Sequence, residues 1–122
     1  MEKFVNVAFQ KIAVQSSTSK SPSMLPASNA VDGDSGSWIG DLRTCSFTLL
    51  ETNPWWYMDL GRVYEINLIV IYPGFAFQNA ELRVGLRSPV QTDGSMNLTV
   101  NNICGLIADQ NSLQKRNFDI RY

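Results

Sequence analysis

The sequence predicts an all-β fold, a β-sandwich or jelly roll, on three observations. Apolar and polar residues alternate with a period of two in several short runs, as they do in half-buried strands. Gly, Pro, Asn, Asp and Ser bound these runs and favour turns. The apolar spacing of an amphipathic helix is hard to find anywhere in the chain. Short strands separated by tight turns are typical of sandwiches and jelly rolls.

Four segments carry the strand pattern. In 53–61 the alternation places Trp56, Met58 and Leu60 on one face. Segment 63–72 is apolar on both faces, which indicates a central strand covered on both sides, with Tyr64, Ile66, Leu68, Val70 and Tyr72 sharing one face. In 80–87 the pattern predicts a half-buried strand whose inward residues are Ala80, Leu82, Val84 and Leu86. Segment 117–122 repeats the alternation, with Phe118, Ile120 and Tyr122 inward.

The bulk properties limit size and partners. A chain of 122 residues with 44% hydrophobic residues predicts one domain, spanning 1–122, with a single core. A net charge of -1 without a basic cluster argues against nucleic acid as a partner. No apolar run approaches the roughly 20 residues of a transmembrane helix. The first residues lack a secretory leader, so either a signal was removed or the protein is not secreted.

Catalysis is not predicted. The chain has no histidine, and its two thiols, Cys45 and Cys104, therefore lack a neutral-pH base to activate them. The acidic residues show no spacing that singles out a catalytic pair. We therefore expect a binding protein rather than an enzyme.

The long segment 16–41 has little periodicity, and long loops without structure of their own are often functional. It contains four residues with side-chain oxygens, separated by glycines: Asn29, Asp32, Asp34 and Asp41. Such oxygens suit a hard cation such as Ca²⁺. The alternative is a turn rich in Asx residues.

Three other features have two interpretations each. Trp55 and Trp56 are either a platform for stacking a sugar ring or packing residues. Arg62 and Arg83 bind an anion or sugar hydroxyls, or are simply solvated. Asn97-Leu98-Thr99 matches the N-glycosylation sequon, which has meaning only in a secreted chain.

Five segments in order resemble the F-type lectin domain, also called the fucolectin or tachylectin-4 domain. They are NVAFQKIAVQSST, ASNAVDGD, a cysteine eight residues before NPWWYMDLG, INLIVIY and NAELRVG, and the match covers 6–85. The resemblance implies a discoidin-like jelly roll that is secreted, takes part in innate immunity, binds fucose and is stabilised by calcium. It places calcium donors at Asn29, Asp32, Asp34 and Thr44. The remaining donors of the family, a Cys-Glu pair, would lie beyond Tyr122.

The resemblance also implies that the sugar site has changed. Phe47 stands where the family has a histidine, and PGFAFQ (73–78) replaces a loop with two arginines. Charge-assisted hydrogen bonds contribute about 1.5–3 kcal/mol each, so losing three would lower the affinity for fucose by several orders of magnitude. The sequence predicts an aromatic rim instead, formed by Phe47, Tyr72, Phe75 and Phe77. This rim is either a new apolar recognition surface, for a protein or another glycan, or a set of hydrophobic residues that fill a pocket which no longer binds sugar.

In the family, the partners of both matched cysteines also lie beyond Tyr122, so Cys45 and Cys104 are orphaned unless they pair with each other. The chain ends on a strand-like segment, which predicts a fragment, a splice variant or a degenerate copy; a frayed natural terminus is the alternative. We therefore expect an extracellular, calcium-stabilised carbohydrate-binding module with an altered sugar site. The alternative is a protein-interaction or vestigial domain that has kept the scaffold.

Overall fold

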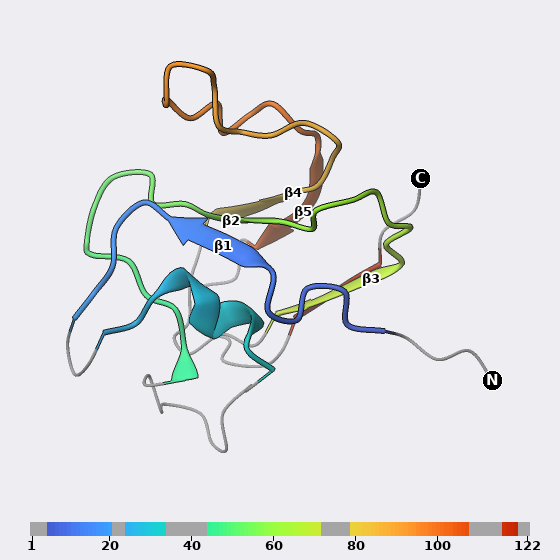
Figure 1. Cartoon of the computed structure of the whole chain (residues 1–122), viewed down its shortest axis with the longest axis horizontal. Helices are drawn as coiled ribbons and strands as arrows, with labels where there is room; N and C mark the ends of the chain where they lie inside the picture. Colours follow the sequence, from blue (N-terminus) through green and yellow to red (C-terminus); the bar gives the residue numbers. More distant parts are fainter. Residues whose placement is uncertain (1–4, 21–23, 34–43, 72–78, 108–115, 120–122) are drawn as a thin grey trace. The chain divides into compact units, whose positions relative to one another are not determined.

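The computed structural model describes residues 5–20, 24–33, 44–71, 79–107 and 116–119. In these ranges the chain forms six short strands and one 3-10 helix, η1 (Figure 1). The chain divides into two compact units, Met1–Arg62 and Val63–Tyr122, and each is described separately. The expectation of one domain stays a prediction.

The first unit is built on a two-stranded antiparallel ribbon. β1 (Ile12–Gln15) pairs with β2 (Trp56–Asp59), in a register that sets Gln15 opposite Trp56 and Ile12 opposite Asp59. η1 (Ala27–Val31) packs against β1. The buried apolar residues of the described chain lie in and beside η1, and they are Leu25, Ala27 and Val31.

The two faces of this ribbon differ. Residues opposite one another in an antiparallel pair share a face, so Gln15 lies on the same face as Trp56. Trp56 Nε1 donates to the Ala27 carbonyl over 2.9 Å, and Gln15 Nε2 donates to the Leu25 carbonyl over 3.1 Å. This face therefore lies against η1 and the segment before it. The half-buried Trp56 ring thus faces η1, in agreement with the packing interpretation.

The second unit contains two further antiparallel pairs. β3 (Leu68–Ile71) pairs with β6 (Arg116–Asp119), and β4 (Ala80–Arg83) pairs with β5 (Ile103–Ile107). The β4–β5 register shifts between Leu82 and Arg83, as it does at a β-bulge. The loop that joins β4 to β5 extends away from this pair (orange in Figure 1).

Two predicted strand faces were wrong. Leu68 and Val70 are 42% and 37% exposed, while Ile69 and Ile71 are half-buried, so β3 is not covered on both sides by the described residues. Both faces of this segment are apolar, and its pairing, not its composition, decides which face turns inward. Leu86, predicted inward, is 84% exposed. Strand β4 ends at Arg83, just after the bulge, so the alternation does not continue to residue 86.

The strand prediction itself is confirmed, because the described elements are strands and one 3-10 turn. No helix in these ranges is long and apolar enough to cross a membrane. Tyr72, Ile120 and Tyr122 lie outside the described residues, and so do Phe75 and Phe77.

Candidate functional site

Residues predicted to hold calcium gather at the end of η1. Asn29 belongs to this 3-10 helix and Asp32 is its C-cap. Residues i and i+3 of a 3-10 helix line up, so the two lie on one side. Asn29 Nδ2 donates to the Cys45 carbonyl over 3.0 Å, which brings the chain next to Thr44 beside the helix. Three of the four predicted positions therefore lie in two adjoining segments; Asp34 lies outside the described residues.

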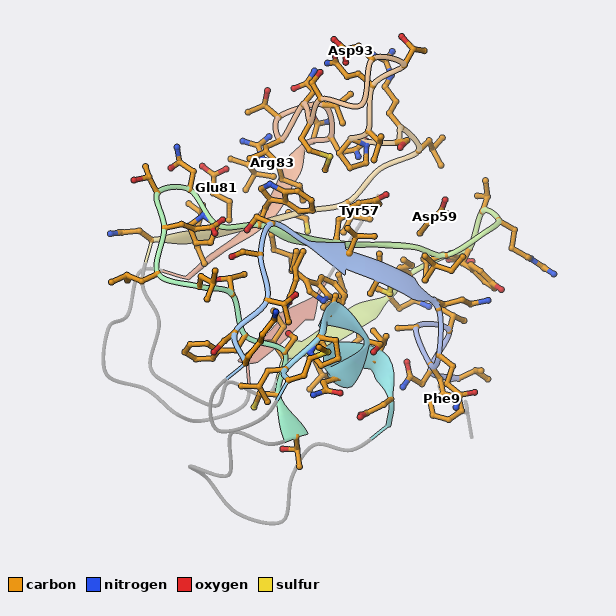
Figure 2. The ribbon with its side chains drawn as sticks, turned by 60° about the vertical axis from the view of Figure 1, so that its left-hand side comes forward. Phe9, Tyr57, Asp59, Glu81, Arg83 and Asp93 are labelled. Atoms are coloured by element: carbon orange, nitrogen blue, oxygen red, sulfur yellow. The ribbon has the colours of Figure 1, made fainter. Side chains whose placement is uncertain are left out.

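The turn that follows Asp32 requires glycine. Gly33 has a φ of +84°, and a Cβ there would lie 2.8 Å from Cε2 of the Phe9 ring. Gln10 N also donates to the Val31 carbonyl over 2.7 Å. The N-terminal segment, with Phe9 labelled in Figure 2, thus contacts the chain on both sides of Asp32.

The donor chemistry fits a hard cation, because Asn29, Asp32 and Thr44 offer oxygen and no softer ligand. The described ranges contain no cluster of three or more His, Cys, Asp or Glu side chains. Any ion bound by the described segments must therefore also use amide, hydroxyl or backbone oxygens. The calcium expectation stays a prediction.

Both cysteines are free thiols, half-buried, and belong to different units. Burial raises the pKa of the Cys104 thiol, which keeps it protonated and weakly reactive at neutral pH.

A network of hydroxyls and a carboxylate joins β1 to the loop before β2. Ser17 Oγ donates to Glu51 Oε2 and accepts a hydrogen bond of 2.9 Å from Leu49 N. Ser16 Oγ accepts a hydrogen bond of 3.1 Å from Trp55 N. Hydrogen bonds from the Ser16 and then the Ser17 side chain lower the pKa of the Glu51 carboxyl. At neutral pH this exposed carboxylate is therefore ionised and accepts hydrogen bonds from the serine hydroxyls.

Trp55 follows this network with an aromatic pair. Its ring lies 6.1 Å from the ring of Tyr57, centroid to centroid, at an interplanar angle of 42°. This tilted contact is within the range of favourable aromatic pairs. Trp55, Trp56 and Tyr57 are all half-buried, and the Trp56 indole differs in donating to the Ala27 carbonyl of η1.

The Phe47 backbone is part of the scaffold. Phe47 N donates to the Leu25 carbonyl over 3.1 Å, and the Phe47 carbonyl accepts from Ser19 N over 2.8 Å. Gln15 Nε2 donates to the Phe47 carbonyl over 3.2 Å and to Thr18 Oγ1 over 3.1 Å. Three segments distant in sequence therefore meet at Gln15. The other rim residues, Tyr72, Phe75 and Phe77, lie outside the described residues, so the aromatic rim stays a prediction.

Arg83 is engaged within its own unit. Its Nε and Nη2 donate to Glu81 Oε2 over 3.1 and 2.9 Å, and Nη1 donates to the Asn101 carbonyl over 2.8 Å (Figure 2). This guanidinium supports the bulge between β4 and β5. An anion or sugar would have to compete with these contacts.

The Ser16, Ser17 and Glu51 network was missed by sequence reasoning. Ser17 and Glu51 are 34 residues apart, and no local pattern links them. The only signal available was the position of Glu51 at the start of ETNPWW, four residues before Trp55.

A protein-family model described as "NedA-like, galactose-binding domain" matches residues 29–121. The match begins at the first predicted calcium position and includes parts of both units. It overlaps the segment that resembles the F-type lectins (6–85) over 29–85 and continues beyond it. Comparisons with curated proteins and with solved structures gave no significant match.

Proposed function

Because the chain belongs to the family of NedA-like, galactose-binding domains, we propose that it is a non-catalytic carbohydrate-binding module. Membership confirms the predicted fold class, a discoidin-like β-sandwich. It supports carbohydrate binding in general; assignment to the F-type lectins is part of the proposal.

The observation that carries the proposal is the exposed carboxylate of Glu51, which accepts hydrogen bonds from serine hydroxyls. Sugar sites combine a few oriented polar groups with aromatic or apolar surface. A carboxylate accepts strong hydrogen bonds from hydroxyl groups, and aromatic faces pack against the C–H faces of sugar rings. Glu51 is exposed and accepts from serine hydroxyls, and the backbone N–H of Trp55 donates to one of them, Ser16 Oγ. We assign Glu51 as the sugar-binding acceptor and Trp55 as its apolar neighbour.

We further propose that the sugar site is altered from that of fucose-binding lectins. Phe47 stands at the histidine position, and the segment 73–78 has no arginine. Apolar contacts from Phe47, Tyr72, Phe75 and Phe77 replace charged ones in this proposal. The ligand is a glycan, either fucosylated or terminated by galactose, and it is bound without hydrogen bonds from the two arginines of the family.

Glycan binding tests this function directly. The intact chain should bind at least one glycan on an array carrying fucosylated and galactose-terminated structures, with calcium present. Glu51→Gln should weaken that binding about 10- to 100-fold, the effect of losing one charge-assisted hydrogen bond. Glu65→Gln, an exposed acid in the other unit, should leave it unchanged. Binding to no glycan, with or without calcium, would refute the function.

We also propose that calcium stabilises the fold, held by Asn29, Asp32, Asp34 and Thr44 with the oxygens that surround them. A ligand that binds only the folded state raises its stability, by about 2.7 kcal/mol at a concentration 100 times Kd. Calcium should therefore raise the melting temperature of metal-free protein by several degrees, and EDTA should reverse this. Asp32→Asn should reduce the response strongly, whereas Asp93→Asn should not. An identical melting curve with and without calcium would refute the calcium site, and the segment from Asn29 to Asp34 would then be only a turn rich in Asx residues.

A protein-interaction module is the second candidate, favoured by exposed leucines. Leu49 and Leu50 are both exposed at the edge of the Ser17 network, and Met24 is also exposed, next to the Leu25 whose carbonyl accepts from Phe47 N. Exposed apolar groups that cluster mark interaction surfaces. The two candidates are separated by the array, because only the first requires a glycan ligand.

A further inference from the structure

The loop between β4 and β5 is ordered by its own hydrogen bonds. Val90 and Met96 form an isolated antiparallel bridge. On the outer side of the bridge Gln91 N donates to the Ser95 carbonyl over 2.8 Å, and on the inner side Asn97 N donates to the Pro89 carbonyl over 2.8 Å. Asp93 lies at the outer end of this loop (Figure 2), where its carboxylate accepts from Ser95 N and Oγ. The loop therefore presents residues 96–99 on a defined backbone.

Asn97-Leu98-Thr99 is the single Asn-x-Ser/Thr sequence with a non-proline middle residue among the ten asparagines of the chain. Thr99 N and Thr99 Oγ1 both donate to Asn97 Oδ1, over 3.2 and 3.1 Å. A backbone N–H can only donate, so its contact identifies which carboxamide atom is the oxygen. Both contacts thus occupy Oδ1, and Asn97 Nδ2 has no hydrogen-bond partner among the described residues.

Asn101, in the same loop, shows the contrast. Its Nδ2 donates to the Arg87 carbonyl over 2.7 Å, and its Oδ1 accepts from Arg87 N over 3.2 Å. The Asn101 carboxamide is used at both ends to close the loop. The Asn97 carboxamide is oriented at one end and available at the other.

Asn97 is half-buried, and the two residues that follow it are exposed. Leu98 and Val90 are each 40% exposed, and Thr99 is also exposed. Pro89, next to Val90, holds Asn97 through its carbonyl.

From this geometry we propose that Asn97 is an N-glycosylation site, used when the chain passes through a secretory pathway. The co-substrate is an oligosaccharide on a lipid pyrophosphate. A bond forms between Asn97 Nδ2 and the anomeric carbon of the sugar, while the bond from that carbon to the pyrophosphate oxygen breaks. The pyrophosphate leaves with the electron pair, and Nδ2 gives one proton to a base of the transferase. The Thr99 hydroxyl orients the acceptor amide.

The test uses the full chain behind a cleavable secretion signal in a eukaryotic host. Intact mass is measured before and after digestion with a peptide-N-glycosidase, on secreted and cell-retained protein together. We expect a glycan mass that the enzyme removes, leaving aspartate at residue 97. Asn97→Gln and Thr99→Val should each abolish it, whereas Thr99→Ser, which keeps the hydroxyl, should retain it.

Two outcomes would overturn the proposal. One is a wild-type chain that enters the secretory pathway, shown by signal cleavage, without a glycan. The other is a glycan that persists in Asn97→Gln. Folding failure does not obscure the result, because the retained protein is included in the measurement. The site is also independent of lectin activity, so a negative glycan array would not bear on it.

Discussion

Replacing Gly85 with alanine should cost the second unit about 2–4 kcal/mol of folding free energy, the range for overpacking combined with a lost hydrogen bond. A Cβ on Gly85 would lie 2.1 Å from Asn101 Oδ1, 2.6 Å from its Cγ and 2.9 Å from its Cβ. Asn101 cannot retreat without breaking both of its hydrogen bonds to Arg87. Urea denaturation followed by circular dichroism measures the loss, and hydrogen exchange over residues 84–102 locates it.

A double-mutant cycle isolates the cause. Asn101→Gly removes all three atoms that the new Cβ would meet, so Gly85→Ala in that background should cost little further stability. If Gly85→Ala is equally costly with and without Asn101, the contact with Asn101 is not its cause.

The periodicity of the sequence predicts strands better than it predicts their faces. For 53–61 the alternation predicts both the strand and the face that carries Trp56, and the Trp56 indole lies against η1. In 63–72 both faces are apolar, so alternation cannot select one, and the expectation that both are covered was wrong for Leu68 and Val70. Leu86 was predicted to point inward because the alternation was extended past Leu82. The register shift after Leu82 depends on the partner strand β5, so the sequence of β4 alone does not reveal it.

The site shows the same division between local and distant information. Asn29 and Asp32 are close in sequence, and the structure places both at η1, together with the chain beside Thr44. The Glu51 network and the Gln15 junction instead join residues more than 30 positions apart. Such contacts depend on how β1 pairs with β2. The local sequence therefore indicated the predicted calcium segment, whereas the orientation of Glu51 required the fold.

The Gln15 junction also decides which part of the first unit is most sensitive to mutation. Leu25 N donates to the Ser19 carbonyl over 3.0 Å, and the Leu25 carbonyl accepts from both Phe47 N and Gln15 Nε2. Its side chain is 0% exposed. One residue thus supplies both backbone hydrogen bonds and the most deeply buried apolar group between β1 and η1.

Leu25→Ala should therefore destabilise the first unit by about 3 kcal/mol, within the range for truncating a buried leucine and leaving a cavity. Met24→Ala is the matched control: Met24 is adjacent in sequence but 62% exposed, so its truncation should change the free energy of unfolding by less than about 0.5 kcal/mol. All three tryptophans lie in this unit, so their fluorescence reports its unfolding in urea. Equal losses in the two variants would contradict a core centred on Leu25. A large loss in Leu25→Ala alone would show that the segment before η1 is held by burial, which is the support that Asn29 and Asp32 need to keep their positions.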